Sequence, residues 1–207
     1  MKLLIVESPT KAAKIAKFLS ADWRVEASRG HLRDLPEKAL GVDIKHEFAL
    51  EYHLLADHRG TLSRLKKVAA TANAVYLATD PDREGEAIAW HLAELLKHET
   101  QKLTVYRVTF NAVTQKAVTD ALAAPRRIDL ALVDAQIARR TLDRLVGYLV
   151  SPIACKKLDG RYSAGRVQSA CLRLVVEREQ ECASFQPTRY WTLVPSQRRY
   201  NGYKLAF

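Results

Sequence analysis

Acidic residues alternate with other residue types in the segment 79–86, which reads TDPDREGE. Asp80 and Asp82 are two positions apart, so an extended backbone would direct both side chains to the same side. Glu84 follows near the expected start of a helix. Carboxylates this close repel one another unless a proton or a cation intervenes. Oxygen ligands without a neighbouring histidine or cysteine favour Mg²⁺ over zinc, so the segment is a candidate magnesium site.

A further acidic residue, Glu7, ends the apolar run Lys2–Val6, and Lys11 follows four residues later. If both acidic segments end neighbouring parallel strands, Glu7 lies beside Asp80 and Asp82, because ligands gather at the carboxyl ends of such strands. Lys11 would then offset the negative charge and contact a phosphate. Acidic residues at a helix start are favoured by the helix dipole alone. It is the second acidic strand end, at Glu7, that favours a site over a solvated turn.

The elements that must position these residues follow from the apolar pattern of the first 125 residues. A helix is expected to begin at Ser8 and Pro9, because serine is a good N-cap and proline is tolerated in the first turn. Residues 28–41 contain two glycines and a proline and are expected to form a loop. The other expected elements are strands at Lys2–Val6, Trp23–Ala27, 74–78 and 105–110, and helices at 59–72 and 84–97. Strands that alternate with helices predict an α/β fold, a mainly parallel, Rossmann-like sheet with helices on both faces.

From about Pro125 the chain becomes helical and basic. Residues 1–125 hold 18 Lys and Arg against 16 Asp and Glu, whereas residues 126–207 hold 15 against 7. Helices are expected at 128–149 and 167–181, and strands at 190–194 and 203–207. Arginine predominates in this part, and its planar guanidinium suits phosphate. A basic excess of this kind favours a polyanionic partner.

Other classes of protein are disfavoured by the sequence. No apolar stretch approaches the ~20 residues of a transmembrane helix, and the first apolar run is too short for the core of a signal peptide. The three cysteines, Cys155, Cys171 and Cys182, have no zinc-site spacing. These observations favour a cytoplasmic protein with reduced cysteines and no membrane partner.

Five collinear stretches between residues 4 and 169 resemble segments of type IA DNA topoisomerases. Their sequences are more similar to the bacterial topoisomerase I branch than to topoisomerase III. Residues 4–12 (LIVESPTKA) and 78–91 (ATDPDREGEAIAWH) resemble the two signatures of the Toprim domain of that family. Residues 30–36 (GHLRDLP), 134–148 (DAQIARRTLDRLVGY) and 163–169 (SAGRVQS) resemble its loop after the second strand, its next helix and its strand-binding turn. The resemblance implies a Toprim domain at 1–125, a smaller helical, basic DNA-binding segment at 126–184, and the first strands of a gate or arch domain at 185–207.

The resemblance also implies an activity. Such enzymes relax negatively supercoiled DNA by Mg²⁺-dependent, ATP-independent cleavage of one strand, strand passage and religation, and we expect a monomer that binds single-stranded DNA. Asp80, Asp82 and Glu84 would hold Mg²⁺. Glu7 would act as an acid or base at the scissile phosphate or share the metal, and Lys11 would stabilise the charge on that phosphate.

DNA contacts are implied in the same way. His31 would touch DNA from its loop, and Arg139 and Arg140 would contact phosphates, with Asp143 on the same helix. Tyr148 would stack on a base. Cys155 falls where relatives can have a large aromatic residue near DNA. The expected turn would offer backbone N–H groups to a phosphate, and it comprises Ser163, Ala164, Gly165, Arg166, Val167 and Gln168.

The sequence departs from the family at the nucleophile. The family's catalytic tyrosine stands in a segment reading roughly Thr-Tyr-x-Arg-Thr-Asp-Ser, and none of the eight tyrosines here does. We therefore expect a partial chain that binds Mg²⁺ and DNA but is inactive alone. One alternative is another Toprim protein, such as a primase or a small nuclease, although residues 134–148 and 163–169 argue against it. The other is a DNA-binding or partner-docking remnant without catalysis.

Overall fold

The computed structural model describes residues 1–101 and 103–192. The chain divides into two compact units, Met1–Arg166 and Val167–Phe207. Almost all of α6 (Arg166–Ser184) lies in the second unit, and residues 185–192 after it have no regular structure. Residues 190–192 of the expected strand at 190–194 have no regular structure, and residues 193 and 194 lie outside the described residues. The expected strand at 203–207 lies entirely outside them.

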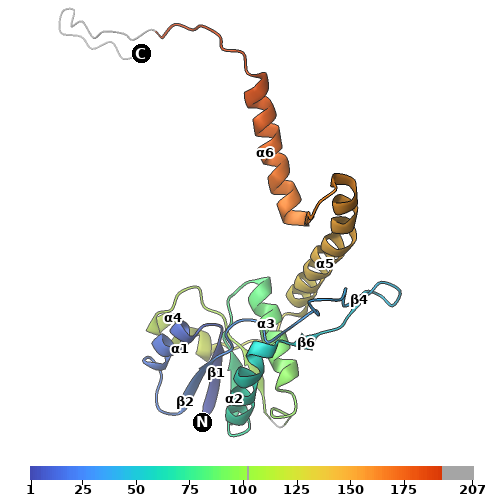
Figure 1. Cartoon of the computed structure of the whole chain (residues 1–207). Helices are drawn as coiled ribbons and strands as arrows, with labels where there is room; N and C mark the ends of the chain where they lie inside the picture. Colours follow the sequence, from blue (N-terminus) through green and yellow to red (C-terminus); the bar gives the residue numbers. More distant parts are fainter. Residues whose placement is uncertain (102, 193–207) are drawn as a thin grey trace, which may run out of the picture. The chain divides into compact units, whose positions relative to one another are not determined.

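The first unit is built on a sheet of parallel strands (Figure 1). The order across the sheet is β2 (Trp23–Ala27), β1 (Lys2–Val6), β7 (Ala74–Leu77) and β8 (Val105–Arg107), and each neighbouring pair is parallel. The two central strands, β1 and β7, therefore end side by side at the same edge of the sheet. The strands expected within residues 1–125 are all present, although β7 and β8 are shorter than expected.

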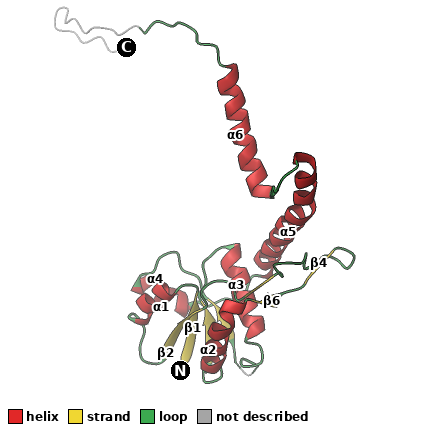
Figure 2. Ribbon diagram, in the orientation of Figure 1, coloured by secondary structure: helices red, strands yellow, loops and turns green. Residues whose placement is uncertain are grey.

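Helices cover both faces of this sheet (Figure 2). Because successive strand residues point to opposite faces, Leu3 and Ile5 pack against α2 (Arg59–Ala69) and α3 (Arg83–Leu95). Leu4 and Val6 pack on the other face, against α1 (Pro9–Ala16) and α4 (Gln115–Ala123). The predicted α/β sheet with helices on both faces is confirmed.

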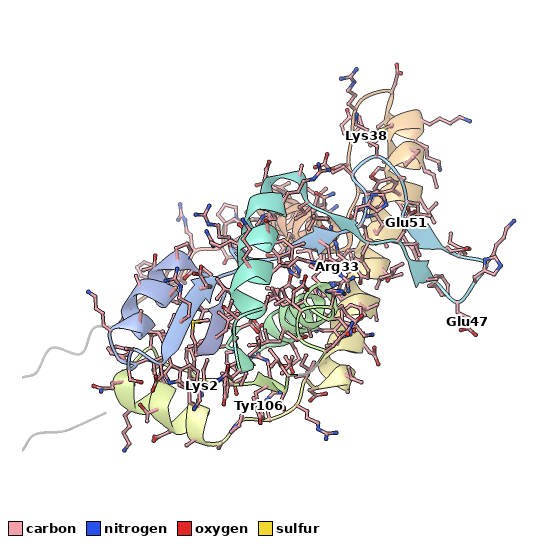
Figure 3. All side chains as sticks on the ribbon, turned by 90° about the horizontal axis from the view of Figure 1, so that it is seen from below. Lys2, Arg33, Lys38, Glu47, Glu51 and Tyr106 are labelled. Atoms are coloured by element: carbon pink, nitrogen blue, oxygen red, sulfur yellow. The ribbon has the colours of Figure 1, made fainter. Side chains whose placement is uncertain are left out.

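The segment between β2 and β7 contains more structure than a loop. β3 (Arg33–Asp34) pairs with β6 (His53–Leu54), and β4 (Val42–Asp43) pairs with β5 (Ala49–Leu50), both antiparallel. The second pair forms a hairpin that carries Glu47 near its tip, away from the sheet (Figure 3). A short 3₁₀ helix at Ala56–His58 leads into α2.

The long helix α5 (Leu130–Leu158) leaves the sheet and carries the first arginine-rich segment. It was expected to end at 149 but continues through Pro152, whose missing N–H removes one helical hydrogen bond without ending the helix here. It ends at Leu158, and Asp159 after it adopts a left-handed conformation with φ of 48°. Within the described part of the chain, we find no helix with the length and apolar character needed to cross a membrane.

Candidate functional site

The ends of the two central strands bring Glu7 and Asp80 together. Glu7 follows β1 directly, and Asp80 lies three residues beyond β7. The backbone N–H of Asp80 donates a hydrogen bond of 2.9 Å to Glu7 Oε1. The convergence of these strand ends, which the sequence predicts, is therefore present in the fold.

Lys11 reaches Asp80 from the first turn of α1. Ser8 caps this helix, its Oγ accepting the N–H of Lys11 at 3.2 Å, and Pro9 occupies the first turn. The ammonium group of Lys11 contacts Asp80 Oδ1. Both side chains are partly exposed, so the ion pair adds little stability. Its effect is to place a positive charge at the edge of the sheet where the carboxylates gather.

Residues 79–85, which we call the acidic turn, are held tightly against the start of α3. Asp82 caps α3, its Oδ1 accepting the N–H of Gly85 at 2.7 Å. Thr79 Oγ1 donates to the Gly85 carbonyl at 2.6 Å. A Cβ on Gly85 would lie 2.2 Å from the Asp80 carbonyl oxygen, so only glycine fits here. Asp80 and Asp82 therefore have different partners, although their spacing suggested a shared direction.

Glu84 faces a cavity of about 330 Å³ beside the acidic turn. His31 Nε2 lies 2.5 Å from Glu84 Oε1, and Gln136 Nε2 lies 3.5 Å from Glu84 Oε2. The cavity is lined by His31, Arg33, Asp34, Tyr52, Glu84, His91, Gln136, Arg139, Arg140 and Asp143. It brings the predicted DNA contacts His31, Arg139, Arg140 and Asp143 next to one predicted metal ligand.

A buried histidine orients Arg33 in this cavity, among side chains of α3 and α5 (Figure 3). His91 is only 3% exposed, and Arg33 Nε donates to its Nδ1 at 2.6 Å. Burial, with the positive charges of Arg33 and His31, lowers the pKa of His91 to about 3. His91 is therefore a neutral acceptor at physiological pH. The Arg33 guanidinium also lies 5.0 Å from the ring centroids of Tyr52 and Trp90.

Asp34 fixes Arg140 through two parallel hydrogen bonds. Arg140 Nε donates to Asp34 Oδ1 at 3.0 Å, and Arg140 Nη2 donates to Asp34 Oδ2 at 2.5 Å. Burial alone would raise the pKa of Asp34, but hydrogen bonds from Arg140 and from the Leu35 N–H outweigh it and lower that pKa. The pair attaches α5 to the loop after β2 and holds Arg140 at the wall of the cavity.

Tyr148, one helical turn beyond Arg144 on α5, also contacts this loop. Its hydroxyl donates to the Glu37 carbonyl and accepts from Arg144 Nη1 at 2.9 Å. The Arg144 guanidinium lies 4.9 Å from the centroid of the Tyr148 ring. Part of the ring surface is thus in contact with Arg144, and stacking of Tyr148 on a base stays a prediction.

Residues 159–165 fold back along the second half of α5. Ser151 Oγ accepts the Ala164 N–H at 2.9 Å, and Cys155 Sγ accepts the Tyr162 N–H at 3.3 Å. Asp143 accepts from Arg166 Nε at 2.8 Å, and Arg139 Nε lies 3.8 Å from its other oxygen.

The expected turn that opens a helix is present, with Ser163, Ala164 and Gly165 before α6. Val167 and Gln168 belong to the second compact unit. No observation here tests DNA contact by this turn, which stays a prediction.

Comparison with known proteins decides the family. Residues 2–113 match the model of the Toprim domain, and residues 127–204 match the model of DNA topoisomerase. The chain belongs to the type IA DNA topoisomerases. The domain boundaries at 125 and 184 stay predictions.

Two relatives place the chain within the topoisomerase I branch. DNA topoisomerase 1 of Zymomonas mobilis is 51% identical over 196 residues, which are 93% of this chain and 16% of that protein. Full-length topoisomerase I of Thermotoga maritima matches with a TM-score of 0.80 and 41% identity, over 90% of this chain and 31% of that one. This topoisomerase chain thus spans less than a third of the length of either relative.

The carboxylates of Glu7, Asp80, Asp82 and Glu84 are suitable Mg²⁺ ligands by their chemistry, but they are not arranged around one common position. Within residues 1–101 and 103–192, no three His, Cys, Asp or Glu side chains are grouped as a metal site. Lys11 contacts Asp80, Asp82 caps α3, and Glu84 faces His31. In the described structure, each of Glu7, Asp80 and Asp82 uses only one carboxylate oxygen in a protein hydrogen bond. Their second oxygens are the hard donors that Mg²⁺ prefers.

Sequence reasoning missed a buried ion pair behind the acidic turn. Glu86 and Arg107 are both 0% exposed, and Arg107 Nε donates to Glu86 Oε2 at 2.9 Å. Arg107 also donates to the carbonyls of Thr79 at 2.8 Å and Asp80 at 2.7 Å. Arg107 lies in the predicted strand 105–110, where a charged residue among apolar ones was the available signal.

Proposed function

We propose that this chain is the Toprim-containing part of an enzyme that relaxes negatively supercoiled DNA. The reaction is ATP-independent cleavage of one strand, strand passage and religation, and it depends on Mg²⁺. Family membership supports this proposal, and the hydrogen bond between Asp80 and Glu7, with Lys11 beside it, is the observation that carries it. We also propose that the protein is cytoplasmic and monomeric.

The acidic edge of the sheet is the proposed phosphate site. Asp80 and Asp82, with Glu7 and Glu84, would hold Mg²⁺, which when bound supplies positive charge for the phosphate oxygens. Lys11 adds a fixed positive charge at the same edge, since its ammonium already contacts Asp80. Glu7 lies at the end of β1 and would hold or release a proton at the scissile phosphate. These roles are consistent with electrostatic stabilisation of a phosphoryl transfer.

The cavity and α5 form the proposed path of a single DNA strand. Arg139 and Arg140 would contact phosphates, and Asp34 and Asp143 already orient these two guanidinium groups. His31 would contact the strand where the cavity meets Glu84. The other proposed DNA contacts are Asp143, Tyr148, Cys155, Ser163, Ala164, Gly165, Arg166, Val167 and Gln168.

A binding comparison tests the proposal. A labelled single-stranded oligonucleotide and the duplex of the same sequence are titrated with the chain, and fluorescence anisotropy is recorded. We expect tighter binding of the single strand, and substantially weaker binding after Arg139 and Arg140 are both changed to alanine. The matched control is the double variant R59A/R127A, which removes two exposed arginines, at the start of α2 and before α5. Equal affinity for the duplex, or equal loss in the control, would count against the proposal.

A plasmid assay separates the proposal from its alternatives. The chain alone should leave supercoiled plasmid unchanged in Mg²⁺, because no tyrosine stands in the nucleophile segment described above. Nicking of the plasmid without a protein-linked product would instead favour a Toprim nuclease. Relaxation of the plasmid by the chain alone would contradict the prediction that this chain has no nucleophilic tyrosine.

A further inference from the structure

We propose that Arg126 and Glu86 are positioning residues that link the start of α5 to the acidic turn. Through this link, the helix that carries Arg139 and Arg140 and the carboxylates at Asp80 and Asp82 are held in a fixed relation. This proposal rests on the proposed function, because it takes α5 as the DNA site and the carboxylates of the acidic turn as the Mg²⁺ site. The contacts that make the link are independent of that function.

On one side, Glu86 holds the segment that leads into α5. Arg126 Nη1 donates to Glu86 Oε1 at 2.8 Å, and Arg126 Nη2 donates to Glu86 Oε2 at 2.7 Å. The Asp129 N–H donates to Glu86 Oε1 at 2.7 Å. Asp129 is the N-cap of α5, since its Oδ1 accepts the N–H groups of Ala131 and Leu132. Glu86 therefore fixes the first residues of the helix directly.

On the other side, Glu86 holds Arg107, which holds the acidic turn. The guanidinium of Arg107 donates to Glu86 and to the backbone carbonyls of Thr79 and Asp80. The Arg107 N–H donates to the Arg126 carbonyl at 2.9 Å, and the Arg126 N–H donates to the Arg107 carbonyl at 2.8 Å. This antiparallel bridge holds the segment before α5 beside the end of β8. A continuous path of hydrogen bonds thus runs from the N-cap of α5 to the backbone of Asp80.

The chemistry of the path makes it stiff. Glu86 and Arg107 are wholly buried, and paired charges in such a place leave few alternative arrangements, because an unpaired buried charge is costly. The fork of two bonds from Arg126 to the carboxylate also fixes their relative orientation. Burial alone would raise the pKa of Glu86, but hydrogen bonds from Arg126 and the Asp129 N–H outweigh it and lower that pKa. A displacement at the start of α5 is therefore transmitted to Asp80.

If the two sites share this link, their ligands bind cooperatively. Mg²⁺ at the acidic turn would strengthen the binding of a single DNA strand to α5, and the strand would strengthen Mg²⁺ binding by the same factor. Removal of Arg126 should reduce this coupling, although Arg126 is assigned to neither site.

The test uses Arg126→Gln with Arg127→Gln as the matched control. Both residues are exposed, and each change removes one positive charge from the same segment. In the described part of the chain, the Arg127 side chain has no hydrogen bond or ion pair, and only its carbonyl accepts from Arg126. Arg126→Gln is a cleaner change than one at Glu86, because the partly exposed guanidinium of Arg126 can be removed without leaving Arg107 unpaired.

The first measurement is amide hydrogen exchange of Asp80 and Gly85 in protein without metal or DNA. Both N–H groups are held by side chains of the acidic site, so their exchange reports its order. We expect exchange to be about 5-fold faster or more in R126Q, and unchanged in R127Q. Unchanged exchange in R126Q would overturn the link, whatever the DNA result.

The second measurement is the factor by which Mg²⁺ tightens the binding of a single-stranded oligonucleotide. We expect a factor of about 5 or more for the unaltered chain and for R127Q, and a factor reduced by at least half in R126Q. Faster exchange with an unchanged factor would overturn the coupling. If the unaltered chain binds the oligonucleotide with no Mg²⁺ effect, the cooperativity is overturned. If it binds no single strand at all while exchange in R126Q is faster, the proposed function fails and the structural link stands.

Discussion

The backbone N–H of Asp80 donates to the carboxylate of Glu7 at 2.9 Å, although 73 residues separate them in the chain. The two residues meet because the neighbouring strands β1 and β7 are parallel and end at the same edge of the sheet. Lys11 reaches the edge from α1. The proposed phosphate site depends on this arrangement.

Two glycines offer a contrast that tests the packing of the acidic turn. In G85A the new Cβ would lie 2.2 Å from the Asp80 carbonyl oxygen, so the turn must move, at a cost of about 1–3 kcal/mol. In G60A, within α2, no atom lies within 4 Å, and alanine should stabilise the helix by about 0.5–1 kcal/mol. Urea unfolding of both variants measures the difference. A G85A protein as stable as G60A would show that the turn is not tightly packed.

Loss of the Glu86 charge should be among the most damaging substitutions. E86Q keeps the side-chain shape but leaves Arg107 buried without its ionic partner. Breaking such a pair costs about 3–5 kcal/mol. The matched control is E179Q on the exposed surface of α6, for which we expect no measurable change. Equal midpoints of chemical unfolding for the two variants would contradict the assigned role of Glu86.

His91 should make stability depend on pH. Its folded pKa of about 3 lies below the unfolded value of 6.5, so the unfolded state binds the extra proton. Stability from this residue is fully present above pH 6.5 and is lost as the pH falls toward 3. Between pH 7 and pH 5 the loss should be about 2 kcal/mol.

Urea unfolding at pH 7, 6 and 5 tests this dependence, with H91Q as the comparison. The free energy of unfolding of H91Q should fall less steeply over this range, because glutamine binds no proton. A variant with the same slope as the unaltered chain would show that His91 is not responsible.

Salt dependence tests whether Arg140 contacts phosphate. If it does, R140A should lower the slope of log affinity against log salt concentration for a single strand by about 0.7. The control is R59A, since Arg59 is an exposed arginine at the start of α2. An R140A protein that binds more weakly but keeps the full slope would assign Arg140 a structural role through Asp34.

Local signals predicted much of the fold. Ser8 and Pro9 marked the start of α1, and the apolar runs located the strands, because capping and burial leave clear patterns in sequence. β3 and β6 escaped notice, since two-residue strands have no periodicity. The helix α4 was not predicted, although Thr114 caps it and Val118 is buried beneath it.

The candidate site was only partly predictable. The meeting of Glu7 and Asp80 was predictable, because neighbouring parallel strands end at the same edge of a sheet. The capping role of Asp82 depends on where α3 begins, and this was not fixed by spacing. Arg107 pairs with Glu86, 21 positions away in the chain, and its place among apolar residues signals a buried charge but does not identify the partner.

A Mg²⁺ titration followed by calorimetry measures whether a metal site lies where β1 and β7 meet. The chain is compared with D80N/D82N, which removes two carboxylates, and with D120N on the exposed side of α4. Asparagine also caps helices well, so the double variant should stay folded. We predict Mg²⁺ binding by the unaltered chain and by D120N, and a loss of at least about tenfold in affinity for D80N/D82N. Equal Mg²⁺ affinity in all three proteins would contradict a metal site at the meeting of β1 and β7.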